Sequence, residues 1–112
     1  MGPAEQRRIV AREMRRAAEA MWVEAAYVVS PWKHNIEAHP DDMLRAVGRL
    51  RATVEDLERS TVRFARTPIE DRARPVSWAQ IGSALRGWSS RDAARKAWAP
   101  AVADLVLPRR RR

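Results

Sequence analysis

Hydrophobic positions in the first third of the chain recur at steps of three and four, the spacing of one face of an α-helix. The repeating residues are Val10, Met14, Ala17, Met21, Ala25 and Val28. Pro3 suits a first helical turn, and Ser30-Pro31 is expected to end the helix, which predicts a helix over about 3–29. Past Ala17 this helix is apolar on nearly all sides, which favours burial against another subunit.

A second apolar stripe is more regular still. It repeats at steps of four and three over three heptads and consists of Met43, Val47, Leu50, Val54, Leu57, Thr61 and Phe64. The stripe predicts a helix over about 42–65, capped by Asp41 or Asp42 and stopped by Thr67-Pro68. Charged residues, Arg63 among them, are expected on its exposed faces. The pattern fits an antiparallel hairpin with the first helix and a coiled coil between subunits equally well, and a four-helix dimer core would satisfy both.

The segment between these helices, Pro31 to Pro40, has the composition of a loop. The only cluster that could bind a metal is formed by His34, Glu37 and His39 of this segment with Asp41 and Asp42 directly after it. The spacing fits no zinc pattern, so loop and capping roles are expected instead. Because Gly-rich phosphate loops, nucleophile elbows and paired carboxylates in apolar settings are also missing, we expect no metal, no cofactor and no enzymatic activity.

A short helix is predicted after a connector at 67–75. Ser77 is a good N-cap, and Gln80 stands at the capping-box spacing. Trp78, Ile81 and Leu85 follow at steps of three and four, and Gly87 is the natural left-handed end.

A second short helix is predicted over 91–98, capped by Ser89 or Ser90 and ended by Ala99-Pro100. Its packed face is expected to comprise Ala93, Ala94, Ala97 and Trp98, with Arg91 and Arg95 on the opposite side. The apolar segment 101–107 is expected to form a further short helix that closes the core through Val102, Leu105 and Val106.

The runs SWAQIGSAL (77–85) and SRDAARKAW (90–98) resemble the helix-turn-helix of many bacterial regulators, with the approximate pattern S-W-x-x-I-G-x-x-L-G-x-S-R-Q-A-A-x-x-R-F, and also the DNA-contacting region of sigma factors. The resemblance covers about 22 residues, all after residue 75. It implies that the second helix enters a DNA major groove and contacts it through Ser90, Arg91, Arg95 and Lys96. The alternative is a pair of packed helices with no role in DNA binding.

The chain departs from this pattern in two places. Four residues, 86–89, stand where the regulators have two, so the angle between the helices can differ. Asp92 replaces the usual Gln, and a carboxylate can only accept, for instance from a cytosine amine. Asp92 could instead orient Arg91 or pair with Lys96.

The positive charge is concentrated near the C-terminus. The chain carries +8 overall, but residues 1–42 have net −1, 43–72 net +2 and 73–112 net +7. Bias toward GC-rich codons explains why 20 of the 22 basic residues are Arg, but not where they stand. Concentrated positive charge favours a polyanion, most often nucleic acid. The terminal Arg109, Arg110, Arg111 and Arg112 suit phosphates or a narrow minor groove, or form a solvated end without a role.

These patterns predict an all-α protein with a helical hairpin at 1–66 for dimerisation or partner binding, a helix-turn-helix region at 75–107 and an arginine tail at 108–112. The expected DNA-contacting residues are Ser89, Ser90, Arg91, Asp92, Arg95, Lys96, Arg109, Arg110, Arg111 and Arg112. The expected function is a small transcriptional regulator, a homodimer whose two recognition helices meet successive major grooves of double-stranded DNA about 34 Å apart. The alternative is a helical adaptor whose apolar N-terminal helices bind a protein partner.

The expected location is the cytoplasm, in association with the nucleoid. The chain has no Cys, which excludes disulfides and fits a reducing compartment. The most apolar run, 17–29, contains Glu19 and Glu24 and is too short and too charged to span a bilayer, so no membrane partner is expected.

Overall fold

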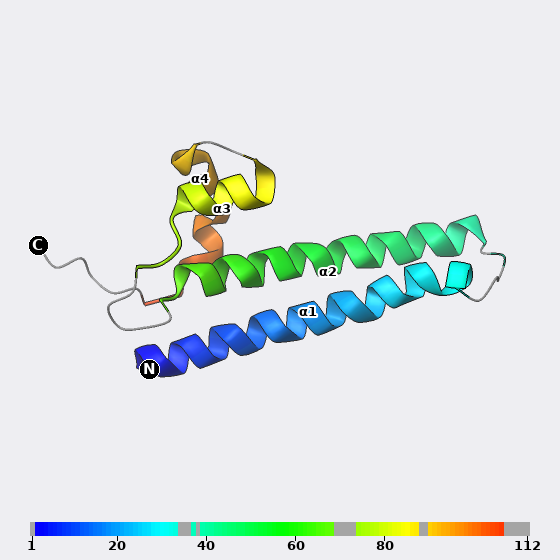
Figure 1. Cartoon of the computed structure of the whole chain (residues 1–112), viewed down its shortest axis with the longest axis horizontal. Coiled ribbons are helices and arrows are strands. Elements are labelled where there is room, and N and C mark those ends of the chain that lie inside the picture. The colour runs from blue at the N-terminus through cyan, green and yellow to red at the C-terminus, as the bar shows by residue number, and fades with distance from the viewer. Residues whose placement is uncertain (1, 34–36, 38, 69–73, 88–89, 107–112) are drawn as a thin grey trace, which may run out of the picture.

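The computed structural model describes residues 2–33, 37, 39–68, 74–87 and 90–106, and within these ranges the protein is all-α, without strands. The elements are α1 (Pro3–Lys33), α2 (Pro40–Arg66), α3 (Trp78–Arg86) and α4 (Arg91–Val102). The two long helices lie side by side as an antiparallel hairpin, and the two short ones sit against α2 near its C-terminal end (Figure 1). The molecule is elongated, about 62 × 31 × 19 Å. The predicted all-α hairpin followed by two short helices is confirmed.

Two helices continue past prolines that were expected to end them. α1 includes Pro31 and ends at Lys33, and α4 includes Pro100 and ends at Val102. Each proline is the third residue from the end of its helix, so it removes one backbone hydrogen bond in the last turn only. The carbonyls that lose a donor belong to Tyr27 and Lys96, both exposed residues, where water can serve as the donor.

The predicted Asp cap of α2 is wrong by two or three residues. The N-cap is His39, whose Nδ1 accepts a hydrogen bond from the backbone N–H of Asp41 at 3.3 Å. Pro40 then occupies the first helical position, where its fixed φ and missing N–H cost nothing. Asp41 and Asp42 fall in the first turn, where carboxylates favour the positive end of the helix dipole. The stop at Thr67 is as predicted.

The hairpin has a thin core. Val10, Ala17 and Ala46 are its buried apolar residues, and most of the heptad stripe of α2 is only half-buried. Val47 and Val54 of that stripe remain about half exposed. Two helices can cover only one side of each other, so much of the apolar surface of α1 and α2 stays open to solvent.

The main hydrophobic core lies where α3 and α4 meet α2. It comprises Val62 of α2, Trp78 and Ile81 of α3, and Ala94 and Trp98 of α4. The C-terminal pair, α3 and α4, therefore buries its apolar faces against α2 as well as against each other. The further helix expected over 101–107 does not form in the described part: Ala101 and Val102 belong to α4, 103–104 form a turn, and 105–106 have no regular secondary structure. Val106 is exposed, while Val102 packs at the edge of the core.

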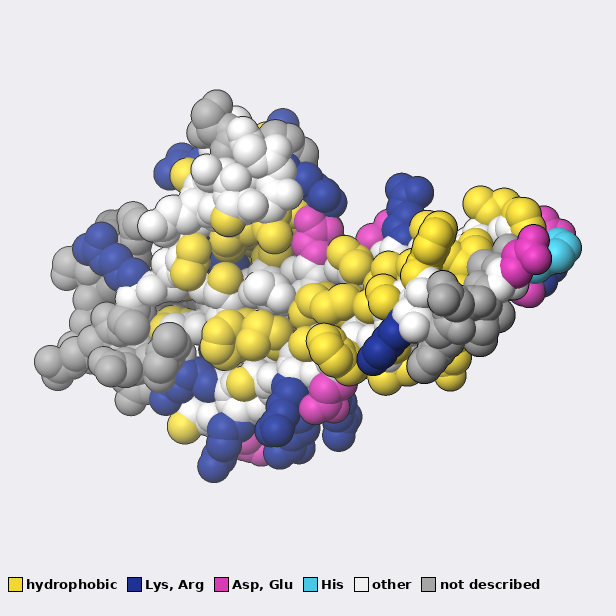
Figure 2. All heavy atoms as spheres, turned by 45° about the vertical axis from the view of Figure 1, so that its right-hand side comes forward, with side chains coloured by type: hydrophobic (Ala, Val, Ile, Leu, Met, Phe, Trp, Pro, Cys, Tyr) yellow, Lys and Arg dark blue, Asp and Glu magenta, His cyan; other side chains and the backbone are white. Residues whose placement is uncertain are grey.

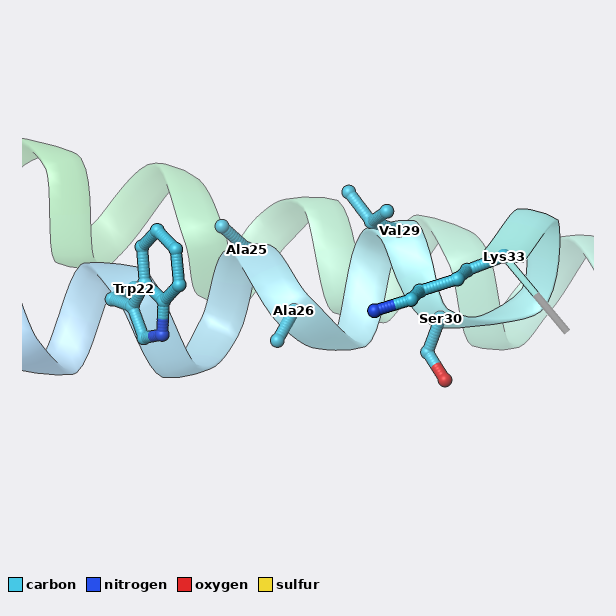
Figure 3. Close-up of a pocket in the computed structure, with 6 residues that line it drawn as sticks. All are labelled: Trp22, Ala25, Ala26, Val29, Ser30 and Lys33. Atoms are coloured by element: carbon cyan, nitrogen blue, oxygen red, sulfur yellow. The ribbon is translucent and has the colours of Figure 1, made fainter.

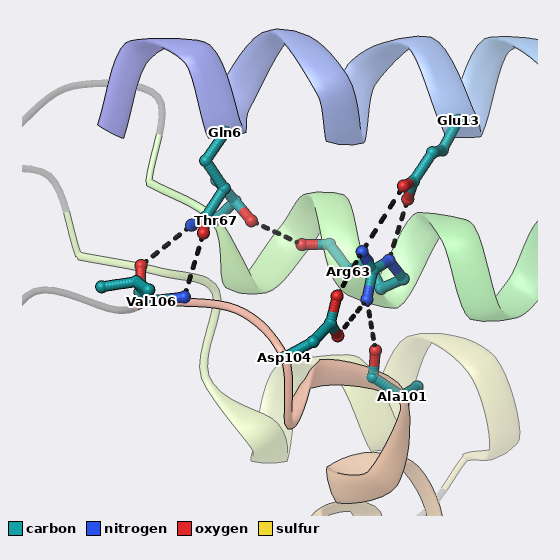
Figure 4. A network of polar contacts seen from close by, with 7 residues as sticks. All are labelled: Gln6, Glu13, Arg63, Thr67, Ala101, Asp104 and Val106. Atoms are coloured by element: carbon teal, nitrogen blue, oxygen red, sulfur yellow. Dashed lines mark hydrogen bonds and ion pairs between the residues drawn. The ribbon is translucent and has the colours of Figure 1, made fainter. Parts of the chain in front are cut away.

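A buried guanidinium, that of Arg63, ties three helices together (Figure 4). The sequence places Arg63 on an exposed face, but its side chain is only 8% exposed. Nε donates to Glu13 of α1 at 2.9 Å, and Nη1 donates to the carbonyl of Ala101 of α4 at 2.8 Å. Nη1 and Nη2 also donate to the two oxygens of Asp104 at 2.6 and 3.1 Å. Charge-assisted bonds to two carboxylates and a carbonyl offset the desolvation of the buried cation.

A second polar contact closes the same corner. The side-chain amide of Gln6, itself buried, donates to the carbonyl of Val106 at 2.8 Å and accepts from its N–H at 2.9 Å. These two bonds join the Gln6 side chain of α1 to both backbone polar groups of Val106, in the segment after α4. Together with Arg63 it fixes the C-terminal pair against the hairpin (Figure 4).

The Arg63 contact predicts a loss of stability in acid. Hydrogen bonding to Arg63 holds the pKa of Asp104 below its ordinary value. The stabilisation is therefore full above the unfolded-state pKa and is lost as pH falls through the lower folded-state pKa. Asp104→Asn should lower the free energy of unfolding by about 1 kcal/mol at neutral pH, a modest effect because the carboxylate is 66% exposed. Urea titrations at several pH values should show this deficit shrinking in acid.

Asp56→Asn, at an exposed position of α2, is the matched control and should show no such pH-dependent deficit. A deficit for Asp104→Asn that stays constant down to the acid limit would contradict the assigned role of the carboxylate.

Candidate nucleic-acid interface

α3 begins as predicted. The Ser77 hydroxyl accepts from the N–H of Gln80 at 3.1 Å, and the Gln80 side chain accepts from the N–H of Ser77 at 3.1 Å, which completes a capping box. Trp78 and Ile81 point into the core, with 9% and 4% of their surface exposed. The helix is thus fixed at its start by the cap and along one face by packing.

The turn after α3 depends on Gly87, as expected. Its φ of 68° and ψ of 16° are left-handed, and its N–H donates to the carbonyl of Ser83 at 3.1 Å. This is the conformation in which a residue without Cβ ends a helix at least cost. Ser89, one of the predicted contact residues, lies outside the described residues.

α4 begins at the second of the two serines proposed as caps. The Ser90 hydroxyl accepts from the N–H of Ala93 at 3.2 Å, and the Ser90 side chain is exposed. One N–H of the first turn is therefore already satisfied. The others remain at the exposed positive end of the helix dipole, which suits an anion.

The packed face of α4 is narrower than predicted. Ala94 is fully buried and Trp98 is 8% exposed, whereas Ala93 and Ala97 are exposed. Residues four apart lie on one line along a helix, and each preceding residue lies roughly 100° away around the axis. Contact with α2 and α3 therefore covers the line of Ala94 and Trp98 but does not reach its neighbours.

The predicted cations of α4 are all exposed, but they do not lie on one narrow face opposite the core. Around the helix axis, at roughly 100° per residue, Arg91 and Arg95 are 40° apart and lie on the same side of the buried line. Lys96 lies a further 100° beyond Arg95. Asp92, Arg95 and Lys96, at spacings of three and four, form the outward surface. The Arg91 Nε lies 4.0 Å from a carboxylate oxygen of Asp92, consistent with an orienting role for Asp92. The exposed set is therefore an arc with Arg91 at its edge.

Two other arginines near α4 are engaged with aromatic rings, which the sequence does not reveal. The Arg66 guanidinium carbon lies 4.7 Å from the centre of the Trp78 ring, and its Nη1 donates to the carbonyl of Val76 at 2.9 Å. Burial lowers the pKa of Arg66. Arg86 pairs with Glu58 at 3.0 Å and lies 5.9 Å from the centre of the Trp98 ring. Both use their charge to hold α3 and α4 on α2.

The remaining predicted contacts, Arg109 to Arg112, lie outside the described residues. In the part of the chain that is described, no three His, Asp or Glu side chains gather as metal ligands. None of the described helices is long and apolar enough to cross a membrane. Compared with protein-family models, with curated proteins and with solved structures, the chain matches none. The physical properties of the site itself therefore carry the functional proposal.

The left-handed conformation of Gly87 and the helical position of Gly48 predict opposite changes in stability when each glycine is replaced by alanine. Gly87→Ala should destabilise the protein by about 1–2 kcal/mol, because an L-residue pays for positive φ even though nothing lies within 4 Å of the added Cβ. Gly48→Ala, at an exposed and uncrowded position inside α2, should stabilise it by up to about 1 kcal/mol. Thermal unfolding of the two variants measures both, and equal shifts of the same sign would contradict the assigned turn.

Proposed function

We propose that the protein binds double-stranded DNA through α4 and acts as a transcriptional regulator in the cytoplasm, associated with the nucleoid, as a homodimer. The observation that supports this most is the division of α4. Ala94 and Trp98 hold one side in the core, and Arg91, Arg95 and Lys96 stay exposed along an arc that runs from beside this buried side to the side opposite it. Capped by Ser90, the start of the same helix offers N–H groups to a phosphate.

The distribution of charge supports a polyanion as the partner. Residues 73–112 carry nine basic and two acidic side chains. One of the two acidic residues, Asp104, is neutralised by Arg63, and the other, Asp92, pairs with Arg91. The C-terminal region therefore carries an excess of positive charge, which raises the local concentration of DNA and the rate of encounter.

The second candidate function is a helical adaptor, and a separate observation favours it. Trp22, Tyr27 and Trp32 of α1 are 74%, 60% and 79% exposed. Several exposed aromatic side chains on one helical segment are typical of surfaces that bind another protein. In this function α4 is a docking surface for an acidic protein or RNA.

Substitution of the exposed arginines of α4 tests DNA binding. Arg91→Ala should reduce affinity for a selected duplex by about 1–3 kcal/mol and relax the preference at one base pair, because a bidentate contact to guanine is lost. Arg95→Ala should weaken binding to all duplexes similarly. Arg8→Ala and Arg12→Ala, at exposed positions of α1, are matched controls with little expected effect. Fluorescence anisotropy with selected and random duplexes distinguishes these results.

Equal losses for the α4 and α1 variants would indicate binding by net charge alone. No DNA affinity in the wild-type protein, with a protein partner lost in the Arg91→Ala, Arg95→Ala double variant, would support the adaptor instead.

Removal of Arg109 to Arg112 tests the role proposed for the tail. If the four arginines neutralise phosphates, the truncated protein should lose about 3–4 from the slope of log affinity against log salt concentration. A salt titration of binding to random duplexes gives this slope. An unchanged slope would exclude phosphate contacts by the tail.

A further inference from the structure

One stripe of α1 changes its chemistry halfway along the helix. Its residues, spaced four and three apart throughout, are Arg8, Arg12, Arg15, Glu19, Trp22, Ala26, Val29 and Lys33, and all eight are exposed. The first four are charged, as a solvated face should be. The next three are apolar, and Lys33 ends the stripe. Figure 2 shows the same change, with basic side chains over the first part of the hairpin and hydrophobic ones farther along.

The apolar part of the stripe is hollowed. A shallow depression of about 390 Å³ lies between Trp22 and Lys33, over the small side chains of Ala25 and Ala26, and is completed by Val29 and Ser30. Figure 3 shows that this surface of α1 faces away from α2. A large exposed ring therefore stands directly beside a hollow on the same surface. A second copy related by a two-fold axis could place its Trp22 ring in this hollow while its own hollow receives the Trp22 ring of the first copy.

Charge at the ends of the apolar part selects the direction of pairing. Glu19 lies seven residues before Ala26, and Lys33 lies seven residues after it. In a parallel pair Glu19 would face the partner's Glu19, and Lys33 the partner's Lys33. In an antiparallel pair centred on Ala26, Glu19 faces the partner's Lys33 twice. The same register places Trp22 opposite the partner's Ser30, at the hollow.

We propose that the protein forms a two-fold homodimer in which the C-terminal halves of two α1 helices pack antiparallel about Ala26. Trp22 of each subunit fills the hollow of the other, and Glu19 pairs with the partner's Lys33. This inference deepens the dimer of the proposed function, but it rests on surfaces of α1 that take no part in DNA binding.

The exposed apolar area suits a small contact. At roughly 150–250 Å² for a whole aromatic side chain, Trp22 alone leaves on the order of 150 Å² open to solvent. Val29, the two alanines and the carbon chain of Lys33 extend this surface, which stays below the roughly 600 Å² per partner at the lower end of standard interfaces. A reversible dimer, not a permanent one, is expected.

The arrangement also sets the distance between the two C-terminal regions. Arg63 joins α4 to α1 at Glu13, thirteen residues before Ala26. At 1.5 Å per residue, the two Arg63 sites lie roughly 40 Å apart along the paired helices. The α4 helices therefore sit toward opposite ends of the dimer, separated on the scale of one DNA turn of about 34 Å or more.

The first experiment places a charge on the two-fold axis. Ala26→Arg brings two guanidinium groups together and should weaken dimerisation by about a hundredfold. Ala4→Arg is the matched control, because Ala4 is exposed on the same stripe of the same helix but lies beyond the paired region. Sedimentation velocity over a concentration series measures association, and circular dichroism verifies that helix content is kept. A monomeric wild type, or equal association of both variants, would overturn the proposal.

The second experiment tests the partner and the direction together. Glu19→Lys and Lys33→Glu should each weaken the dimer by about tenfold, because each change sets like charges opposite each other twice. The double variant should recover most of the wild-type association. Two damaged single variants without recovery in the double would overturn the antiparallel register.

DNA affinity of the same variants is measured separately. If a variant no longer dimerises but its monomer still binds DNA, α4 remains the DNA-binding element. Dimerisation as described without any DNA affinity would contradict the proposed function and leave this inference intact.

Discussion

The Arg63 guanidinium is the interaction on which the arrangement of the molecule depends. It lies in the angle between α1, α2 and the end of α4, and every N–H group it directs there meets Glu13, Asp104 or the carbonyl of Ala101. Each of these partners offsets part of the desolvation of the buried cation, so together they favour one arrangement of the three elements. Apolar packing of Ala94 and Trp98 specifies this arrangement less closely, because burial of apolar surface is non-directional and hydrogen bonds are directional.

Fixing the C-terminal pair in this way also determines which charges remain available. Two other arginines lie close to α4 but are engaged within the chain. Arg66 contacts the Trp78 ring and the carbonyl before α3, and Arg86 contacts the Trp98 ring and a glutamate of α2. Arg91, Arg95 and Lys96 are left exposed because they lie on α4 outside the line that α2 and α3 cover. The basic groups that α4 itself leaves exposed are therefore Arg91, Arg95 and Lys96, while other exposed arginines, such as Arg8 and Arg12, lie on α1.

Sequence patterns predicted the local features well because their causes are local. The capping box of Ser77 and Gln80, the left-handed Gly87 and the stop at Thr67 each involve residues within one turn, so spacing alone identifies them. The prolines at 31 and 100 were misjudged because a proline three residues from a helix end costs one bond, and only the structure shows that the freed carbonyls are exposed. Arg63 could not be recognised, because its carboxylate partners stand 50 and 41 residues away in the sequence. The width of the packed face of α4 likewise depends on how α2 approaches it, which no pattern within α4 records.

A two-helix hairpin has one further physical consequence. Each helix can cover only about one face of the other, so a helix that is apolar on several sides must leave some of that surface open. Near its N-terminus, α1 has arginines instead of apolar residues on its outward stripe, so little apolar surface is exposed. In the same part of the hairpin, α2 is also covered by α3 and α4. Toward the turn neither protection exists, since the outward stripe becomes Trp22, Ala26 and Val29 and no described element covers it. The hairpin thus joins an end that α3 and α4 cover to an end whose outward stripe no described element covers. Burial of the apolar end and exposure of the basic end are compatible in one assembly because the two surfaces lie at opposite ends of the same rigid helices.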